Sequence, residues 1–311
     1  MVLSLATSGC VTVHGELAVV PSASRSEAAQ ALKEFTDAYN ASDKAYDAKL
    51  DAGRVTGAFG AINQAGLTSR AVTSPNGNPG HQDLELTDAK FTIPKKAGWP
   101  RWFVADTDSN RDAESGPGDN TWLLVFVRNG PEEAWKVAYL TIVSPRSVPE
   151  FKTDNDGWAQ AVSPDSDALA VAPEDLSTEY ASYLKTGEPA HFAPGPHTDA
   201  WRASREKDAR RPGLTTQYID QPVSDGDFAP LALATKDGGA MAFFATRFFD
   251  RQTAAKGYRP KVDPDVRALL TGEVKNTLTR EWVSSQTVVV PAPGKVAVVG
   301  RLQGVVAAKG S

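Results

Sequence analysis

The sequence predicts an α+β protein made of two similar units, each with amino-terminal helices packed on a curved antiparallel β-sheet. Apolar residues first recur at helical spacing, β-rich runs joined by short turns follow, and the same order then repeats in the second half. The length of 311 residues suits about two domains. We expect a first unit over residues 26–150, a linker over 151–172 and a second unit over 173–311.

The first unit opens with a strong helix signal. Ser24 and Glu27 have the spacing of a capping box, in which the two side chains accept hydrogen bonds from each other's backbone N–H groups. We expect this helix to end near residues 40–42, and a weaker helix, diluted by glycines, over residues 55–67. The apolar face of the first helix consists of Ala28, Leu32, Phe35 and Tyr39.

After the two helices the period changes from helical to extended. Sequential β-rich runs with short connections, and no helix between them, imply an antiparallel sheet. The expected strands of the first unit are residues 84–87, 102–105, 122–127 and 135–143.

The second half repeats this order. Leu176, Tyr180 and Leu184 mark one apolar helical face, and a further helix is expected from about residue 198 or 199 to 211. The run Asp237-Gly238-Gly239 predicts a tight hairpin turn. A short helix ending near Gly272 and strands over residues 231–235, 240–249, 277–290, 295–300 and 302–307 complete this half.

The two halves also correspond in pattern, although residue identity between them is low. Residues 98–105 match residues 227–234, and the run at 135–143 matches the run at 282–290. This correspondence implies duplication of one structural unit.

The single cysteine indicates where the protein works. Cys10 follows apolar and small residues, the pattern that bacteria cleave and lipidate. Residues 2–6 are short for a signal core and no basic residue precedes them, so we expect residues 1–10 to be a truncated lipoprotein signal whose start lies upstream of Met1. Residues 11–25 would then form a tether or an early strand. The alternative is an accidental match at a free buried thiol, because cysteine packs as a small hydrophobe.

Composition excludes several partners. The chain has 33 Lys plus Arg against 38 Asp plus Glu, a net charge of −5, which gives it no electrostatic reason to bind nucleic acid. No block of Lys or Arg suggests a polybasic membrane patch, and no apolar run is long enough for a transmembrane helix. Membrane attachment is therefore expected through lipidated Cys10, on the extracellular face of the cell membrane.

Three segments carry a family resemblance: CVTVHGE at residues 10–16, GWPRWFV at 98–104 and VVAAKG at 305–310. Together they are similar to an uncharacterised lipoprotein family of actinobacteria such as streptomycetes, over nearly the whole chain. The resemblance implies a tethered extracytoplasmic protein and offers no catalytic residues. Helices leading into a curved antiparallel sheet also resemble the NTF2-like and cystatin-like cone, which hosts both enzymes and binding modules.

Two motifs imitate catalytic or metal sites without completing them. Residues 106–112 start like a calcium loop, but Arg111 and Pro117 occupy the positions that need Gly and Glu. We interpret this segment as a solvated hairpin loop. Ser182 and Lys185 have serine–lysine acylase spacing, but the second motif of those enzymes overlaps at Lys185, so the two cannot face each other. Here Gly187 reads as a helix cap.

No other pattern assigns a site. The histidines lack metal-ligand spacing, and two carboxylate pairs could serve acid–base chemistry only at a separation that the sequence does not reveal. We therefore assign no catalytic, cofactor-binding or metal-ligating residue. These groups are His14, His81, His191 and His197, and the pairs Asp106/Asp108 and Glu132/Glu133.

Tryptophans are the remaining signal. Four of the seven cluster in the first unit, where they either fill the core or line a concave ligand surface. We favour the core, with Trp99 beside Pro100 the most exposed.

These inferences favour a lipid-anchored, non-catalytic binding or assembly module of the cell envelope, with an envelope protein or a small apolar molecule as partner. The alternatives are an NTF2-like enzyme acting on a small apolar molecule, and a structural spacer. A deep pocket with a buried Asp, Glu or His of shifted pKa favours the enzyme. A filled cone with an exposed aromatic patch favours binding.

We predict that Cys10→Ala releases the protein into the medium or blocks its processing, because the variant lacks the thiol that carries the lipid. Fractionation of cells into membrane and medium, followed by immunoblotting, measures this. A variant that stays with the membrane as the parent does would show that Cys10 is not the anchor.

Overall fold

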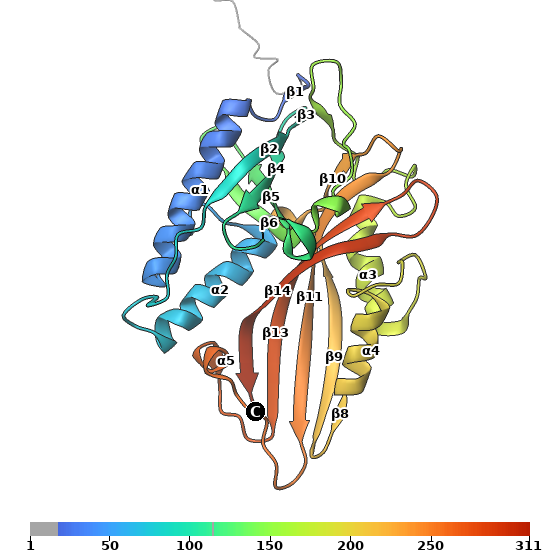
Figure 1. Ribbon diagram of the computed structural model, residues 1–311. Coiled ribbons are helices and arrows are strands. Elements are labelled where there is room, and N and C mark those ends of the chain that lie inside the picture. Colours follow the sequence, from blue (N-terminus) through green and yellow to red (C-terminus); the bar gives the residue numbers. More distant parts are fainter. Residues whose placement is uncertain (1–17, 114) are drawn as a thin grey trace, which may run out of the picture.

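The computed structural model describes residues 18–113 and 115–311 and combines helices with three open sheets (Figure 1). The helices are α1 Arg25–Ala45, α2 Gly57–Thr73, α3 Leu176–Thr186, α4 Asp199–Asp208 and α5 Pro264–Ala268. The strands are β1 Val20–Pro21, β2 Leu86–Thr92, β3 Pro94–Lys96, β4 Arg101–Ser109, β5 Thr121–Arg128, β6 Lys136–Val143, β7 Ala159–Gln160, β8 Arg210–Arg211, β9 Leu214–Val223, β10 Leu231–Ala234, β11 Ala240–Ala254, β12 Leu270–Thr271, β13 Thr277–Val290 and β14 Ala297–Gly310.

The sheets confirm the α+β class. Strands β2-β4-β5-β6 form an antiparallel sheet in that order. A seven-stranded sheet runs β12-β14-β13-β11-β9-β8, with β10 also paired to β11, and is mixed because β12 is parallel to β14. A small sheet, β1-β3-β7, is mixed because β3 and β7 are parallel.

The capping box at the start of α1 is present as predicted. Ser24 Oγ accepts from the Glu27 N–H at 3.1 Å, and Glu27 Oε2 accepts from the Ser24 N–H at 2.7 Å. The helix runs past the expected end at residues 40–42, because the polar side chains there have partners outside the helix. Asn40 donates to the Leu84 carbonyl and Ser42 donates to Asp51, so these residues need not terminate it. Tyr46, in the left-handed region at φ 51°, ends α1.

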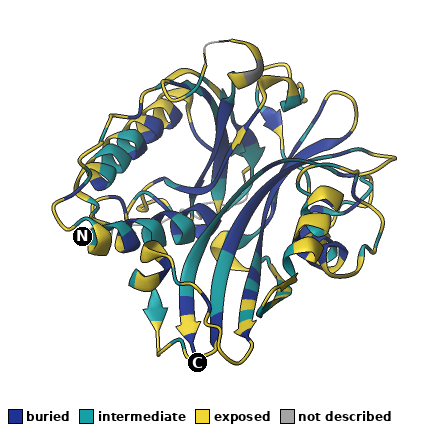
Figure 2. Cartoon of the chain, turned by 60° about the horizontal axis from the view of Figure 1, so that its bottom comes forward, coloured by how far each residue is buried: buried dark blue, intermediate teal, exposed yellow. Residues whose placement is uncertain are grey.

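The core consists of layers, in which β4, β5 and most of β11 are buried on both faces, whereas β9 keeps an exposed face. On β4, Phe103 faces α1, whereas Trp102 faces the seven-stranded sheet. On β11, Phe243 lies in that shared core and Phe244 lies beneath α3. Burial in Figure 2 follows this order, with buried residues along the strands and exposed ones on the outer sides of the helices. Alternate residues of one strand therefore belong to different cores, and the apolar runs of the sequence reflect burial on both faces.

Helix α2 packs against both sheets, through β6 on one side and β13 and β14 on the other. Two glycines of β14 permit this close approach. A Cβ at Gly300 would lie 2.6 Å from Val143 Cγ1, and one at Gly304 would lie 2.8 Å from Ile62 Cγ2. The second sheet thus contacts β6 and α2 at distances that only glycine allows.

Some expected elements differ in extent. The helix expected to reach residue 211 ends at Asp208, because Arg210 and Arg211 pair with β9. The sequence analysis predicted no strand at β9, because most residues of this strand are polar. The strand forms because it pairs with β11. The two strands expected over residues 295–307 are one continuous β14.

The predicted linker contacts the sheets, whereas the predicted tether lies mostly outside the described residues. Within residues 151–172, β7 pairs with β3, and Phe151 and Ala161 form bridges to Thr235 and Leu233. Cys10 and residues 11–17 of the predicted tether lie outside the described residues, and β1 follows them. In the part that is described, no helix is both long and apolar enough to cross a bilayer.

We predict that Phe243→Ala lowers the free energy of unfolding by about 3–5 kcal/mol, because the ring is fully buried between the sheets. Urea titration followed by circular dichroism measures this loss. The matched control is Ile219→Ala on β9, 39% exposed, for which we expect a change within about 0.5 kcal/mol. Equal losses for the two variants would contradict a core shared by the sheets.

Candidate functional site

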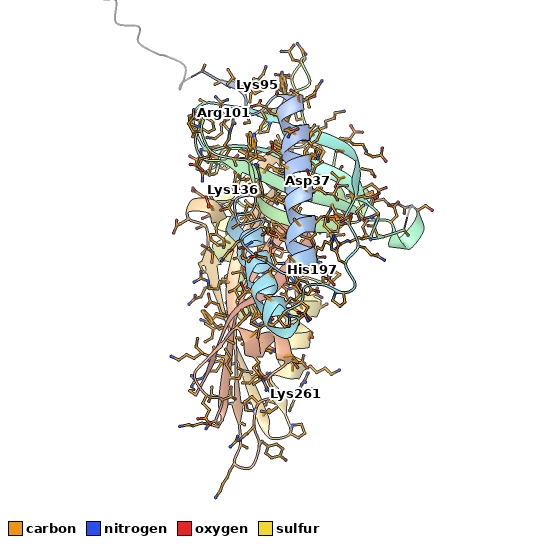
Figure 3. The ribbon with its side chains drawn as sticks, turned by 90° about the vertical axis from the view of Figure 1, so that its left-hand side faces the viewer. Asp37, Lys95, Arg101, Lys136, His197 and Lys261 are labelled. Atoms are coloured by element: carbon orange, nitrogen blue, oxygen red, sulfur yellow. The ribbon has the colours of Figure 1, made fainter. Side chains whose placement is uncertain are left out.

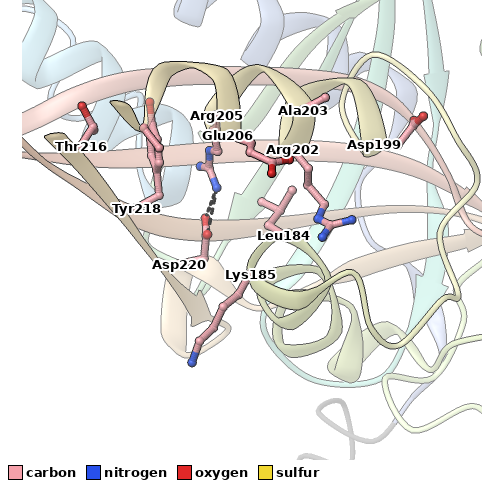
Figure 4. A pocket seen from close by; sticks show the side chains of 11 residues that line it. Leu184, Lys185, Asp199, Arg202, Ala203, Arg205, Glu206, Thr216, Tyr218 and Asp220 are labelled. Carbon is pink, nitrogen blue, oxygen red and sulfur yellow. Dashed lines mark hydrogen bonds and ion pairs between the residues drawn. The ribbon is translucent and has the colours of Figure 1, made fainter. Parts of the chain in front are cut away.

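A pocket of about 530 Å³ lies between the end of α3, helix α4 and strand β9 (Figure 4). Helix periodicity places Trp201 and Arg205 one turn apart on the same side of α4. The two-residue period of β9 puts Tyr218 and Asp220 on one face of the strand. These four side chains therefore meet between helix and sheet.

A buried ion pair forms the inner wall of this pocket. Arg205 Nη1 donates to both carboxylate oxygens of Asp220, at 2.8 and 2.9 Å. Their side chains are only 6% and 4% exposed. The Arg205 guanidinium carbon also lies 4.9 Å from the ring centroid of Tyr218 and 4.5 Å from that of Phe248. Aromatic faces thus replace part of the hydration that the cation loses.

Arg205 is nevertheless incompletely paired. Its Nε and Nη2 atoms are buried and have no hydrogen-bond acceptor among the described residues. A buried N–H without an acceptor costs about 1–3 kcal/mol, and more on a charged group. The guanidinium therefore has unused capacity to donate to an acceptor.

A second guanidinium lies close to the ion pair. Arg301 of β14 stacks on Trp201 at 4.1 Å, and burial lowers its pKa. Burial also raises the pKa of Asp220, while the positive charge of Arg205 opposes this effect. When Asp220 is ionised, two cations share one carboxylate. The three groups Arg205, Arg301 and Asp220 thus carry excess positive charge, which suits an anionic group. The rest of the pocket wall is balanced, with Lys185 and Arg202 against Asp199 and Glu206.

A second, mostly apolar cavity of about 410 Å³ lies between α2, α5 and β14. Phe59, Ile62, Val266 and Leu302 contribute to its wall. Its lining suits a small apolar molecule rather than an ion.

The tryptophans divide into two groups. Trp102, Trp122 and Trp135 are buried, as the core interpretation predicts. The other four are half-buried, and each has at least one arginine guanidinium over its ring. These pairs are Trp99 with Arg101 and Arg128, Trp158 with Arg25, Trp201 with Arg205 and Arg301, and Trp282 with Arg280.

The predicted hairpin loop at residues 106–112 needs a correction. Asp106 and Asp108 belong to strand β4 and pair with β2, so the loop begins only after Ser109. Asp106 accepts a hydrogen bond from Thr121 on the neighbouring strand. The two-residue period of β4 thus places both carboxylates on one face of the strand. Among the described residues, no group of three or more His, Cys, Asp or Glu is arranged to hold a metal ion.

The serine–lysine motif lies at the exposed end of α3. Ser182 Oγ donates to the Glu188 carbonyl at 2.9 Å, and Gly187 caps the helix at φ 88° as predicted. Lys185 is exposed at the rim of the pocket beside α4. Glu132 and Glu133 are exposed in the turn before β6. None of these groups lies at the Arg205–Asp220 pair.

The histidines are dispersed. His81 lies between Asp43 and Asp83, exposed His191 contacts Glu179 at 2.7 Å, and half-buried His197 lies near Arg301, where burial lowers its pKa. His14 lies outside the described residues.

Comparison with known proteins gives one family and several relatives. The model of a family described as Domain of unknown function (DUF8094) matches residues 19–310. An uncharacterized lipoprotein of Streptomyces coelicolor is 57% identical over 310 residues, which cover 99% of this chain and 92% of that protein. An uncharacterized lipoprotein of Streptomyces avermitilis is 51% identical over 313 residues, with the same shares of the two chains. Another uncharacterized lipoprotein of S. coelicolor is 27% identical over 222 residues, which cover 67% of this chain and 59% of that one.

We predict that His81 stabilises the protein in a pH-dependent way. Hydrogen bonds to Asp43 and then Asp83, at 2.8 and 2.9 Å, raise its pKa. A raised folded pKa gives stability that is complete below the unfolded value of about 6.5 and is lost as pH rises through the folded value. Urea titrations of the parent and His81→Gln should therefore differ most near pH 5–6. A difference that grows towards alkaline pH would contradict this assignment.

Proposed function

The chain belongs to the family with the domain of unknown function DUF8094, and on this premise we propose that it is a lipid-anchored, non-catalytic binding module on the outer face of the cell membrane. Two full-length relatives are named lipoproteins, which supports an anchor of this kind. Cys10 is the only cysteine of the chain and the proposed lipidation site. Because Val20 follows it by ten residues, Val20 lies at most about 35 Å from the anchor.

We propose that the pocket beside α4 binds an anionic group, such as a phosphate, sulfate or carboxylate. The observation that carries this proposal is the buried Arg205 guanidinium, whose Nε and Nη2 lack acceptors. Arg301 adds a second cation behind the pocket wall, where it stacks on Trp201. Among the residues that line the pocket, the ring of Tyr218 offers a stacking surface for a flat ligand. A ligand with a ring and an acidic group uses all of these features.

The domain organisation also remains a proposal. We propose two NTF2-like or cystatin-like units, residues 26–150 and 173–311, joined by residues 151–172. The order of two helices followed by antiparallel strands in each half supports this. The apolar cavity beside α2 supports a small apolar molecule as a second ligand class.

An enzyme is the second candidate, favoured by the raised pKa of Asp220 in a pocket. Against it, both oxygens of Asp220 accept from Arg205, so the carboxylate is engaged as a counter-ion. Recovery of a bound ligand chemically unchanged supports binding. Conversion that is lost in Asp220→Asn would favour the enzyme instead.

The test uses phenyl phosphate as a ring-bearing anion and phenol as its neutral match. At ten times its dissociation constant, a ligand adds about 1.4 kcal/mol, which raises Tm by about 2 °C for a chain of this size. We expect this rise with phenyl phosphate and not with phenol, in thermal melts of the full chain.

The variant for this test is Arg205→Met/Asp220→Leu, which removes both buried charges together and so avoids leaving one unpaired. We expect it to fold and to lose the rise in Tm. Arg211→Gln, an exposed arginine just after α4, is the matched control and should keep it. The same rise in the double variant would refute binding at Arg205.

A further inference from the structure

A cluster of cations and aromatic rings lies where β3, β4 and β5 meet the start of α1. The ring of Trp99 lies between two guanidinium groups, with Arg101 at 4.8 Å and Arg128 at 5.3 Å from its centroid. Arg128 also stacks on Trp135 at 4.6 Å. Lys96 ends β3 nearby. We call Lys96, Trp99, Arg101 and Arg128 the headgroup surface.

This surface carries more positive charge than its neighbours neutralise. Among the described residues, the only carboxylate in ion-pair contact with it is Glu27, 3.8 Å from Arg128. Glu27 is also held in the capping box of α1. Lys96 and Arg101 form no ion pair in the described part of the chain. Three cations therefore share one carboxylate.

Two features show that the close approach of these cations is energetically unfavourable. The Nε atoms of Arg101 and Arg128 are buried and lack acceptors among the described residues. Burial, and then the charge of Arg101, lowers the pKa of Lys96. Lys95 differs, since it forms an ion pair with Asp154 at 2.5 Å and is left out of the surface. An external anion would supply the missing counter-charge.

The headgroup surface lies at the end where the described chain begins. Strand β1 pairs with β3 in the register Val20 with Lys96 and Pro21 with Lys95. Figure 3 shows Lys95 and Arg101 at one end of the molecule and Lys261 at the opposite end. A chain anchored through Cys10 would therefore present this end towards the bilayer, within about 35 Å of the lipid.

We propose that the headgroup surface contacts the phosphate groups of anionic membrane lipids and thereby fixes the orientation of the anchored protein. The location rests on the proposed anchoring at Cys10, whereas the affinity rests on Lys96, Arg101 and Arg128. Guanidinium groups pair with phosphate in a bidentate way, and a half-buried tryptophan suits the interface between headgroups and acyl chains. A single contact can be weak, because the tether keeps the lipid at high effective concentration.

The experiment exploits the single cysteine. The full chain is coupled through Cys10 to a maleimide lipid in vesicles of phosphatidylcholine, with or without phosphatidylglycerol. Hydrogen exchange of the amides of Ala97, Gly98, Trp99 and Arg101 is then followed by mass spectrometry. At about fivefold per basic residue near an anionic surface, we expect exchange to slow by about tenfold or more with phosphatidylglycerol. High salt should abolish the difference.

Matched variants separate this surface from general attraction. Lys96→Gln/Arg101→Gln removes two charges, keeps the aliphatic stems and should lose the protection. Lys261→Gln, at the opposite end, should keep it. Equal exchange on both vesicle types, or equal protection in the two variants, would overturn the proposal. Chemical coupling tethers the protein whether or not cells lipidate Cys10, so failure here is distinct from failure of the proposed anchor.

Discussion

The structure depends on burial of both faces of the central strands of its two large sheets. Strands β4, β5 and β11 place alternate residues in two different cores, one of which the sheets share. Once that shared core forms, the outer faces still need cover, which α1 and α3 provide. The same packing requires Gly300 and Gly304, because β14 passes β6 and α2 too closely for a side chain. Helix positions and glycine positions are thus consequences of one constraint.

Where the helices no longer cover the sheets, arginine side chains stack on the partly exposed tryptophans. Four tryptophans are only half-buried, and a guanidinium covers each of them. At Trp201 and at Trp99 two guanidiniums converge, with fewer carboxylates than cations nearby. Stacking lets these cations sit in apolar surroundings, and buried N–H groups of Arg101, Arg128 and Arg205 lack acceptors among the described residues. Both proposed anion contacts therefore arise from the way the edges of the aromatic core are covered.

The headgroup surface and the pocket of Arg205 lie on different parts of the molecule. The headgroup surface adjoins β1, where the described chain begins, whereas the pocket of Arg205 lies under α4 on the outer side of the second sheet. Figure 1 shows β1 at the top of the molecule and α4 at the lower right. A protein held at the bilayer by its first end would therefore keep the pocket apart from the surface that contacts the membrane. Anchoring and ligand binding would then not compete for one surface.

The sequence by itself determined the α+β class, the capped start of α1, the main apolar strands and the hairpin turn at Gly238, because each depends on neighbours along the chain. It also singled out Cys10 as the one thiol available for an anchor. Only the tertiary structure decided the rest. Strand β9 is polar and owes its order to β11, while Arg205–Asp220 and the headgroup surface join residues from separate elements. The cations of the headgroup surface are separated along the chain, so the sequence contains no basic block there. Folding alone brings them together, because β3, β4 and β5 meet in space.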